Sequence, residues 1–301
     1  MNLPRFLNKP EYVRRPQQVI RRLWLTTPFA RQKGNLLCTL SWGLVIRFDP
    51  NEAIGRAILH HGILDLVVTE TIFRLLEDGE TAVDIGANIG HMTGAMAKAS
   101  GPHGRVMSFE PSPKVFGALL DNVSRWRNDA ALALISVQQC AVSNKSGPAV
   151  LYLPPESIAN QGLASLEGAN GGDKIETVQC VVLDEIFGPG CQIGLIKIDV
   201  EGHEFSVLTG AERLLREKRI RDIIFEEHRQ YPSPVHKLLK AHEYALYRLS
   251  RNLSHVQLCR PDDRRTSHEH PFGVQNNFLA TSDSRRAETR LRSTKWVALR
   301  G

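Results

Sequence analysis

The chain has 301 residues, of which 42% are hydrophobic and 23% are charged, with a formal net charge of +6. This is enough sequence for one large α/β domain with a sizeable core. No apolar run reaches the roughly 18 residues that a membrane-spanning helix needs, and arginines interrupt the apolar stretches near the N-terminus, so we expect neither a transmembrane segment nor a cleaved signal. The five cysteines form no CxxC pair, which favours reduced thiols in a cytoplasmic protein over a disulfide framework.

The positive charge is concentrated at the two ends of the chain. Residues 1–33 contain eight lysines and arginines against one acid, and residues 281–301 contain six against two. We interpret these ends as a basic N-terminal arm and a basic C-terminal tail, both solvated and mobile, around a more acidic body of residues 34–280. Nucleic acid is therefore not an expected partner, whereas a peripheral contact between the ends and an acidic membrane surface stays open.

The first half of the body predicts an alternation of strands and helices. A hairpin is expected over 35–48, with its turn near Ser41 to Gly43, and one or two helices over 52–77. Strands then alternate with helices, which is the pattern of a parallel sheet with helices on both faces. The expected strands are 81–85, 105–109 and 134–141, and the expected helices are 90–99 and 113–126.

The second half continues this pattern after an irregular insertion. Residues 144–176 are rich in Gly, Pro, Asn and Ser, and a segment of this length and composition is typical of a functional lid. Polar loops are expected between the last helix and the last strand. The strands expected after the insertion are 177–183, 193–200, 221–226 and 275–280, and the helices are 203–218 and 234–243.

The most informative stretch is TAVDIGANIG, residues 81–90. A buried strand ends near an acid, Asp84, and the chain then turns on Gly86 and Gly90. Glycine has no Cβ and tolerates positive φ, so such a turn lets the backbone approach a ligand closely. Glu110 follows the next strand, twenty residues after Gly90. A glycine turn with an acid at this distance indicates a nucleoside-type cofactor whose ribose hydroxyls are held by the carboxylate.

Two common nucleotide sites are excluded by the residues in the turn. A dinucleotide fingerprint, GxGxxG, would require glycine where Asn88 and His91 stand. A phosphate-binding P-loop would require a GK pair followed by Ser or Thr, which is absent. The remaining pattern is typical of the first motif of S-adenosylmethionine-dependent methyltransferases. Taken alone, it is also compatible with a tight turn that closes a strand in an unrelated α/β fold.

Six motifs in a fixed order carry a more specific resemblance. They are VDIGANIG, FEPSP, CAVSNKSG, VLDEI, IKIDVEGHE and IIFEEH. Together, over roughly residues 55–280, the chain resembles the FkbM family of methyltransferases. The resemblance implies S-adenosylmethionine as the cofactor and a Rossmann-like class I methyltransferase fold, α/β, with a mostly parallel seven-stranded sheet and helices on both faces. His91 and His203 depart from the residues that are common in the family, so the resemblance does not name a substrate.

The resemblance assigns seven residues to the cofactor. Its amino-acid end would meet the turn at Asp84, Gly86, Asn88 and Gly90. Its ribose would be held by Glu110, and its adenine would lie against Ala141 and Val142. An alternative role for Asp84 is to brace the loop without touching the ligand.

Four residues near the ends of two later strands are the candidate catalytic groups. They are Asp199, Glu201, His203 and Glu226, one of which would act as the general base. Glu201 and Glu204 can also be explained as charges that complement a helix N-terminus. Lys197 is expected to pair with Asp199 or Glu226, because a buried charge needs a partner. This network explains the carboxylates without a metal, and we assign none, although a divalent ion remains an alternative reading.

The hypothesis from sequence is an O-methyltransferase that acts on a hydroxyl of a sugar, glycan or polyketide-like natural product. Within the same class, nitrogen or carboxylate is the alternative nucleophile. From a different class, the alternative is a catalytically inactive S-adenosylmethionine-binding module that partners enzymes of glycan or natural-product assembly. If the enzyme hypothesis is right, Asp199→Asn and Glu201→Gln should reduce turnover and leave cofactor binding nearly unchanged.

Overall fold

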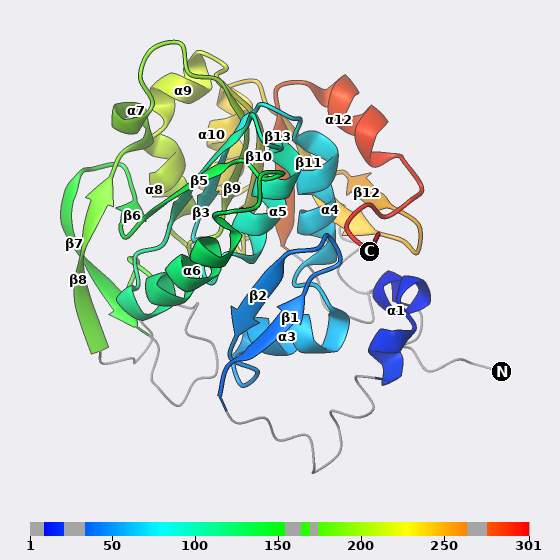
Figure 1. Ribbon diagram of the computed structural model, residues 1–301. Coiled ribbons are helices and arrows are strands. Elements are labelled where there is room, and N and C mark those ends of the chain that lie inside the picture. The colour runs from blue at the N-terminus through cyan, green and yellow to red at the C-terminus, as the bar shows by residue number, and fades with distance from the viewer. Residues whose placement is uncertain (1–8, 21–33, 154–163, 169–173, 264–275, 301) are drawn as a thin grey trace.

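The computed structural model describes residues 9–20, 34–153, 164–168, 174–263 and 276–300. A twisted central sheet is covered by helices on both faces, and a small second sheet lies at one side (Figure 1). The predicted α/β class is therefore confirmed. Among the described helices, none combines the length and the apolar character needed to cross a bilayer.

The central sheet has eight strands, in the order β12-β11-β13-β10-β9-β3-β4-β5. Neighbouring strands from β10 to β5 are parallel, and β13 runs antiparallel to both β10 and β11. The strands are β3 (Thr81–Ile85), β4 (Arg105–Phe109), β5 (Leu134–Gln138), β9 (Ile193–Ile198), β10 (Ile220–Glu226), β11 (Ala245–Arg251), β12 (Val256–Cys259) and β13 (Asn277–Thr281).

The prediction of seven strands was wrong by one. The hairpin β11–β12 adds two strands at the edge of the sheet, where polar loops were expected. The predicted strand 177–183 falls largely on β8 (Lys174–Val181), which belongs to a separate sheet. The sequence gives little sign of it, because β11 contains Arg248, Ser250 and Arg251 and lacks a clear apolar alternation.

The period of two along the buried strands creates two separate cores. Ala82, Leu195 and Ile224 pack with helices on one face, whereas Val83 and Ile196 pack with helices on the other. The first face is covered by α3 (Ala53–His61), α4 (Leu66–Leu75), α5 (His91–Ser100) and α12 (Ser284–Leu291). The second face is covered by α8 (Glu204–Thr209), α9 (Glu212–Arg216) and α10 (Pro234–Ala241), with α7 (Leu183–Ile186) beside them.

The predicted hairpin lies against the helix that follows β4. It consists of β1 (Leu36–Thr39) and β2 (Val45–Phe48), and it packs on α6 (Pro113–Trp126). Asn122 of α6 donates to the carbonyl oxygen of Arg47 at 3.0 Å and to that of Ile89 at 2.8 Å. One buried amide therefore joins the hairpin, the helix and the loop after β3.

The predicted strand 134–141 and the predicted helix 203–218 are both divided in the structure. The first is split between β5 and β6 (Ala141–Val142), which belongs to a three-stranded sheet with β7 (Gly147–Leu153) and β8 (Lys174–Val181). The second is interrupted at Gly210, where a Cβ would lie 2.2 Å from the carbonyl oxygen of Ser143. Of the predicted lid, 154–163 and 169–173 lie outside the described residues.

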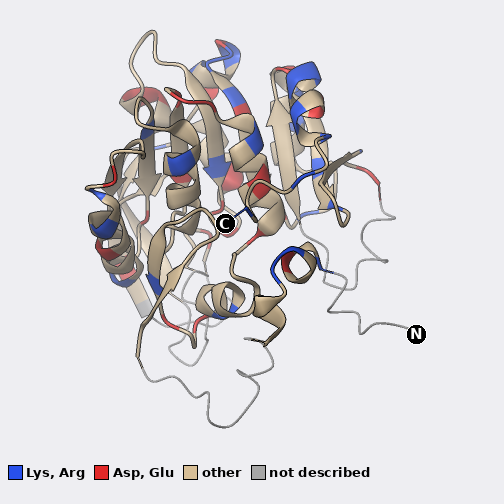
Figure 2. Cartoon of the chain, turned by 45° about the vertical axis from the view of Figure 1, so that its right-hand side comes forward, with Lys and Arg blue, Asp and Glu red and all other residues tan. Residues whose placement is uncertain are grey.

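The basic C-terminal tail packs against the body, contrary to the expectation of a solvated end. Several of its basic residues lie on α12 (Figure 2), where Arg286 contacts Glu77 at 2.7 Å and Asp222 at 3.1 Å. Beyond the helix, Trp296 is 2% exposed and donates to the carbonyl oxygen of Leu253. At the other end, the described part of the N-terminal arm contains the short helix α1 (Pro10–Arg14).

Candidate active site

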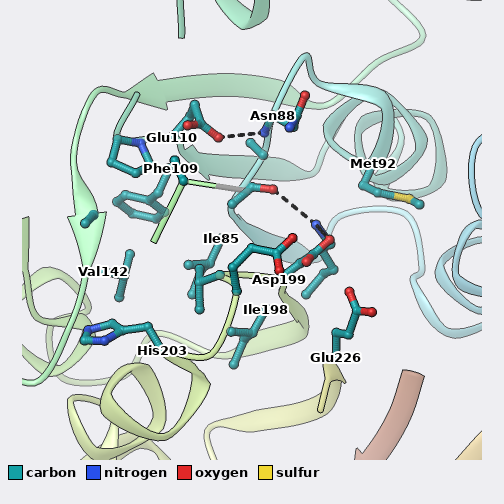
Figure 3. Close-up of a pocket in the computed structure, with 18 of the residues that line it drawn as sticks. Ile85, Asn88, Met92, Phe109, Glu110, Val142, Ile198, Asp199, His203 and Glu226 are labelled. Atoms are coloured by element: carbon teal, nitrogen blue, oxygen red, sulfur yellow. Dashed lines mark hydrogen bonds and ion pairs between the residues drawn. The ribbon is translucent and has the colours of Figure 1, made fainter. Parts of the chain in front are cut away.

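A cavity of about 340 Å³ opens at the carboxyl ends of β3, β4, β9 and β10 (Figure 3). Its volume falls within the range of roughly 300–1,000 Å³ that is usual for small-molecule sites. In an open parallel sheet, ligands bind at this edge because the strand ends and following loops converge there. The predicted site residues that line it are Gly86, Asn88, Glu110, Ala141, Val142, Asp199, Glu201, His203 and Glu226.

The turn after β3 is shaped by close backbone contact. Gly86 has φ of +75°, and a Cβ there would lie 1.9 Å from the carbonyl oxygen of Asp199. Asn88, with φ of +50°, adopts the same left-handed region. Gly90 is not part of the cavity lining, because it faces α6, where a Cβ would lie 2.8 Å from Leu119. The turn therefore brings the ends of β3 and β9 together beneath the cavity.

Asp84 lies under this turn and does not line the cavity. It is fully buried, and its Oδ2 accepts a hydrogen bond from the hydroxyl of Thr93 at 2.6 Å. Its Oδ1 lies 3.7 Å from the ammonium of Lys197. Burial raises the pKa of Asp84, and the charge of Lys197 opposes that rise. These contacts match the alternative role, a brace for the loop.

Glu110 presents a carboxylate to the cavity from the end of β4. Its Oε2 accepts from the backbone N–H of Asn88 at 2.9 Å, and its Oε1 accepts from that of Ser112 at 3.0 Å. Burial raises the pKa of Glu110 to about 7, against the effect of these two hydrogen bonds. Each carboxylate oxygen has a second lone pair, so an ionised Glu110 can still accept hydrogen bonds from two hydroxyl groups.

The cavity beside Glu110 is apolar. Ala141 and Val142 line it as predicted, together with Phe109 and Cys140, which sequence reasoning missed. A carboxylate that can hold a diol next to an apolar surface fits the ribose and adenine of a nucleoside. The residues present therefore fit S-adenosylmethionine.

Lys197 connects the turn to the catalytic candidates. Its side chain is 9% exposed, and its ammonium contacts Asp199 Oδ2 at 3.1 Å and donates to the carbonyl oxygen of Gly86 at 3.2 Å. Burial alone would lower the pKa of Lys197, but the carboxylates of Asp199 and Asp84 outweigh it and raise the pKa. Of the two predicted partners of Lys197, Asp199 is the one in contact.

Glu226 faces the same cavity from the end of β10, near Asp199 (Figure 3). Burial raises the pKa of Glu226 to about 8, and the charge of Asp199 and a hydrogen bond with it add to the rise. The pKa of Glu201 is also raised, by burial and then by Asp199. Glu201 has φ of +50° and lies beyond the end of β9, so the strand alternation does not set its direction. Acids with pKa values near neutrality are suited to proton transfer.

His203 is held away from these acids. Its Nε2 lies 2.9 Å from the hydroxyl of Ser143, and its Nδ1 lies 2.6 Å from a carboxylate oxygen of Glu167. In Figure 3 its ring points away from Asp199 and Glu226. With both nitrogens engaged, His203 links α8 to the segment around Glu167. The nearby Glu204 accepts from the backbone N–H groups of Val200 and Gly202, which is a structural role.

The cavity residues that were not predicted include Asp65, Met92 and Asn277. Asp65 caps α4 through the N–H groups of Val67 and Val68, and an Asp before an apolar run could have indicated that cap. Nothing in the sequence indicated that Asn277 would reach Asp65, which it does at 2.8 Å. Within the described ranges, no group of three or more His, Cys, Asp or Glu side chains is arranged to hold a metal ion.

Comparison with known proteins places this site in a family. Residues 84–249 match the model of the FkbM methyltransferase domain. The chain is 34% identical over 181 residues to the 31-O-demethyl-FK506 methyltransferase FkbM of Streptomyces tacrolimicus, covering 51% of this chain and 67% of the relative. It is 31% identical over 185 residues to the hexuronic acid methyltransferase AglP of Haloferax volcanii, covering 59% and 70% respectively.

A solved structure of methyltransferase FkbM from Methylobacillus flagellatus resembles this chain with a TM-score of 0.44 and 18% identity, covering 69% of this chain and 47% of that one. The family match spans both the turn at Gly86 and the acids at Asp199 and Glu226. The expected family, enzyme class and cofactor are thereby confirmed. The chain belongs to the FkbM family and is a methyltransferase that uses S-adenosylmethionine.

Proposed function

We propose that this enzyme methylates a hydroxyl oxygen of a sugar, a glycan or a polyketide-like natural product, with Glu226 as the general base. The observation that carries the proposal is the contact chain Lys197–Asp199–Glu226, which faces the same cavity as Glu110. A hydroxyl must lose a proton as it is methylated, and the carboxylate of Glu226 is the group that would receive this proton. By their names, the two relatives described above act on 31-O-demethyl-FK506 and on a hexuronic acid.

The roles of the residues follow from their contacts. The ammonium of Lys197 lies 3.1 Å from Asp199 Oδ2 and forms an ion pair with that carboxylate. The charge of Asp199 disfavours ionisation of Glu226 and so raises the pKa of Glu226 towards the working pH. Near neutrality Glu226 can therefore release its proton and take up another one from the acceptor.

The bound cofactor would supply an electrophilic methyl group, with Glu110 holding its ribose. The acceptor hydroxyl would donate a hydrogen bond to Glu226 and pass its proton to that carboxylate as the methyl group leaves the cofactor's sulfur for the acceptor oxygen. Asp199 and the backbone of the turn at Gly86 keep the ends of β3 and β9 in register, which orients the two reacting groups. A carboxylate acceptor would be ionised already and would not need this base, which favours a hydroxyl.

The proposal is tested in two steps on the full chain. Calorimetry should detect binding of S-adenosylmethionine, and a mass-spectrometric screen of sugars and macrolide alcohols should detect products heavier by one CH₂ group. Asp199→Asn and Glu201→Gln should lower turnover while cofactor binding stays nearly normal. Cofactor binding with unchanged turnover in both variants would contradict the assigned chemistry. Cofactor binding without any methylated product would favour the inactive S-adenosylmethionine-binding module.

A further inference from the structure

The cavity wall opposite Glu110 is acidic. We call it the acceptor wall and define it by its polar lining residues: Asp65, Asp199, Glu201, Glu226 and Asn277. In Figure 3, Asp199 and Glu226 lie on this side, and Glu110 lies across the cavity beside Asn88. The wall is assembled from the N-terminus of α4, the loop after β9, the end of β10 and the start of β13.

Asp65 is fixed in this wall on both of its carboxylate oxygens. Its Oδ1 accepts from the N–H groups of Val67 at 2.9 Å and Val68 at 3.1 Å, and its Oδ2 accepts from the amide of Asn277 at 2.8 Å. Asn277 is paired in register with Glu226 across β13 and β10. The capping bond at α4 therefore sets the position of Asp65, and Asp65 in turn holds Asn277 beside the proposed base.

The cations near this wall do not balance it. Lys197 is the one lysine or arginine among the described residues that line the cavity, and its ammonium is already engaged by Asp199 and the carbonyl oxygen of Gly86. His91 also lines the cavity, but burial lowers its pKa to about 3, so it is neutral. His228 contacts Glu226 at 3.3 Å from outside the lining, with its side chain 57% exposed.

One more cation acts from a distance. Arg251 lowers the pKa of Asp65 by its charge, but it is itself paired with Glu11 at 2.7 Å and does not line the cavity. Burial remains the largest influence on Asp65 and raises its pKa. Burial is also the main cause that raises the pKa of Glu201 and of Glu226, and the charge of Asp199 raises both further. A raised pKa favours the protonated form of these acids, because the cations among the described residues do not compensate the ionised form. Once the pH exceeds the pKa of Glu226, about 8, the wall carries negative charge that its surroundings do not balance.

We propose that the acceptor wall selects polyhydroxy acceptors that are neutral or carry an amine, and excludes acceptors that carry a carboxylate or a phosphate. This inference rests on the proposed function and names its substrate class. Hydroxyl and ammonium groups donate hydrogen bonds, which carboxylates accept, whereas an anion would be repelled at short range in a partly desolvated cavity. Specificity then comes from a repulsive element as much as from an attractive one.

Asp65 and Asn277 are the specificity-determining residues in this proposal, because neither contacts Lys197 or takes part in the proton transfer. Asp65→Asn removes one charge but keeps a side chain that caps helices well. The amide of Asn277 can rotate to present its oxygen to the new amide, so the link to β13 can persist. Asp184→Asn is the matched control, since Asp184 also accepts two N–H groups at a helix start, at 2.7 and 3.0 Å, and does not line the cavity.

The test compares four methyl pyranosides that differ in one group: glucoside, glucosaminide, glucuronide and 6-phosphoglucoside. Their binding to the full chain saturated with S-adenosylhomocysteine is measured by saturation-transfer NMR and calorimetry at low ionic strength and at about pH 9, above the pKa of Glu226. We expect the first two to bind at least roughly tenfold more tightly than the two anions, and Asp65→Asn to reduce that ratio by several-fold while Asp184→Asn leaves it unchanged. Glu201→Gln should reduce the ratio as well. Because Glu201 lies outside any strand, this variant replaces Asp65→Asn in the test if Asp65→Asn does not fold.

Equal or tighter binding of the glucuronide would overturn the inference, as would failure of all four probes to bind. A ratio that neither Asp65→Asn nor Glu201→Gln changes would overturn its assignment to this wall. The same titrations separate this inference from the proposed function. No binding of S-adenosylhomocysteine would defeat the proposed function, whereas binding of it together with a preference for anions would defeat the inference on charge alone.

Discussion

The two sides of the cavity are built in different ways. The cofactor side uses the backbone: Glu110 is oriented by the N–H groups of Asn88 and Ser112, and Gly86 approaches the backbone of Asp199. The acceptor wall, in contrast, is made of charged and amide side chains from four separate segments. Backbone groups are the same in every sequence, whereas a side chain changes with a single substitution. A single substitution can therefore alter the acceptor wall more readily than the backbone contacts of the cofactor side.

The largest expected effect is a loss of catalysis without a loss of cofactor affinity, which would separate the acceptor wall from the cofactor side. Glu226→Gln removes the proposed base, so kcat should fall by about 100- to 10,000-fold, while the affinity for S-adenosylmethionine should change by less than about threefold. In the unaltered enzyme, kcat/KM should rise as the pH increases through about 8, because the base acts only when unprotonated. The variant should lose this pH dependence. Rapid-quench kinetics and calorimetry give the two quantities.

The control for that experiment is Glu243→Gln, which alters an exposed carboxylate near Lys218, outside the cavity lining, and should change neither quantity. If Glu226→Gln weakened cofactor binding as much as it lowered kcat, the two sides would not be functionally separate.

The next effect is a loss of stability at the point where the backbones of the two sides meet. Gly86→Ala places a Cβ 1.9 Å from the carbonyl oxygen of Asp199 at φ of +75°, so the ends of β3 and β9 must separate. We expect a loss of about 2–4 kcal/mol in the free energy of unfolding, measured by urea titration. Gly117→Ala is the control, because α6 has open space at that position and alanine favours a helix by about 1 kcal/mol. Similar changes in both variants would show that the close approach at Gly86 does not matter.

A smaller effect is expected on the cofactor side alone. Glu110→Gln replaces a charged hydrogen-bond acceptor by a neutral one and should weaken S-adenosylmethionine by about 10- to 100-fold in calorimetry, with kcat at saturation nearly unchanged. The loss should appear in the affinity and not in the catalytic step, because Glu110 lies across the cavity from Glu226 (Figure 3). A variant with normal affinity would remove Glu110 from the binding site.

The smallest effect is a pH dependence of cofactor affinity. Burial raises the pKa of Glu110 to about 7, and its ionised form is the one that can accept hydrogen bonds from both backbone and hydroxyl groups. Affinity should therefore fall as the pH drops below about 7, by at most about tenfold per pH unit, and stay constant above it. Titrations at several pH values check this, and Glu110→Gln should show a flat profile if the assignment is right.

The sequence by itself determined the cofactor side in some detail. The ends of the strands Thr81–Ile85 and Arg105–Phe109 were predicted to the residue, because buried strands are short apolar runs bounded by glycine or charge. The glycine turn and Glu110 belong to the same stretch of chain, so local sterics and spacing sufficed to place them together. The assignment of Gly90 to the ligand did not fit, since its close contact is with Leu119 of a later helix.

Only the tertiary structure decided the acceptor wall. Asp65 and Asn277 meet although they are 212 positions apart in the sequence, and the strand that carries Asn277 joins the sheet beside Glu226. The edge hairpin β11–β12 and the docking of α12 through Arg286 depend on similarly distant contacts. A local pattern reports which residues can be buried and where the chain can turn. Which side chains meet across a cavity depends on how distant segments pack together. The local sequence of one segment does not indicate which other segment it will contact.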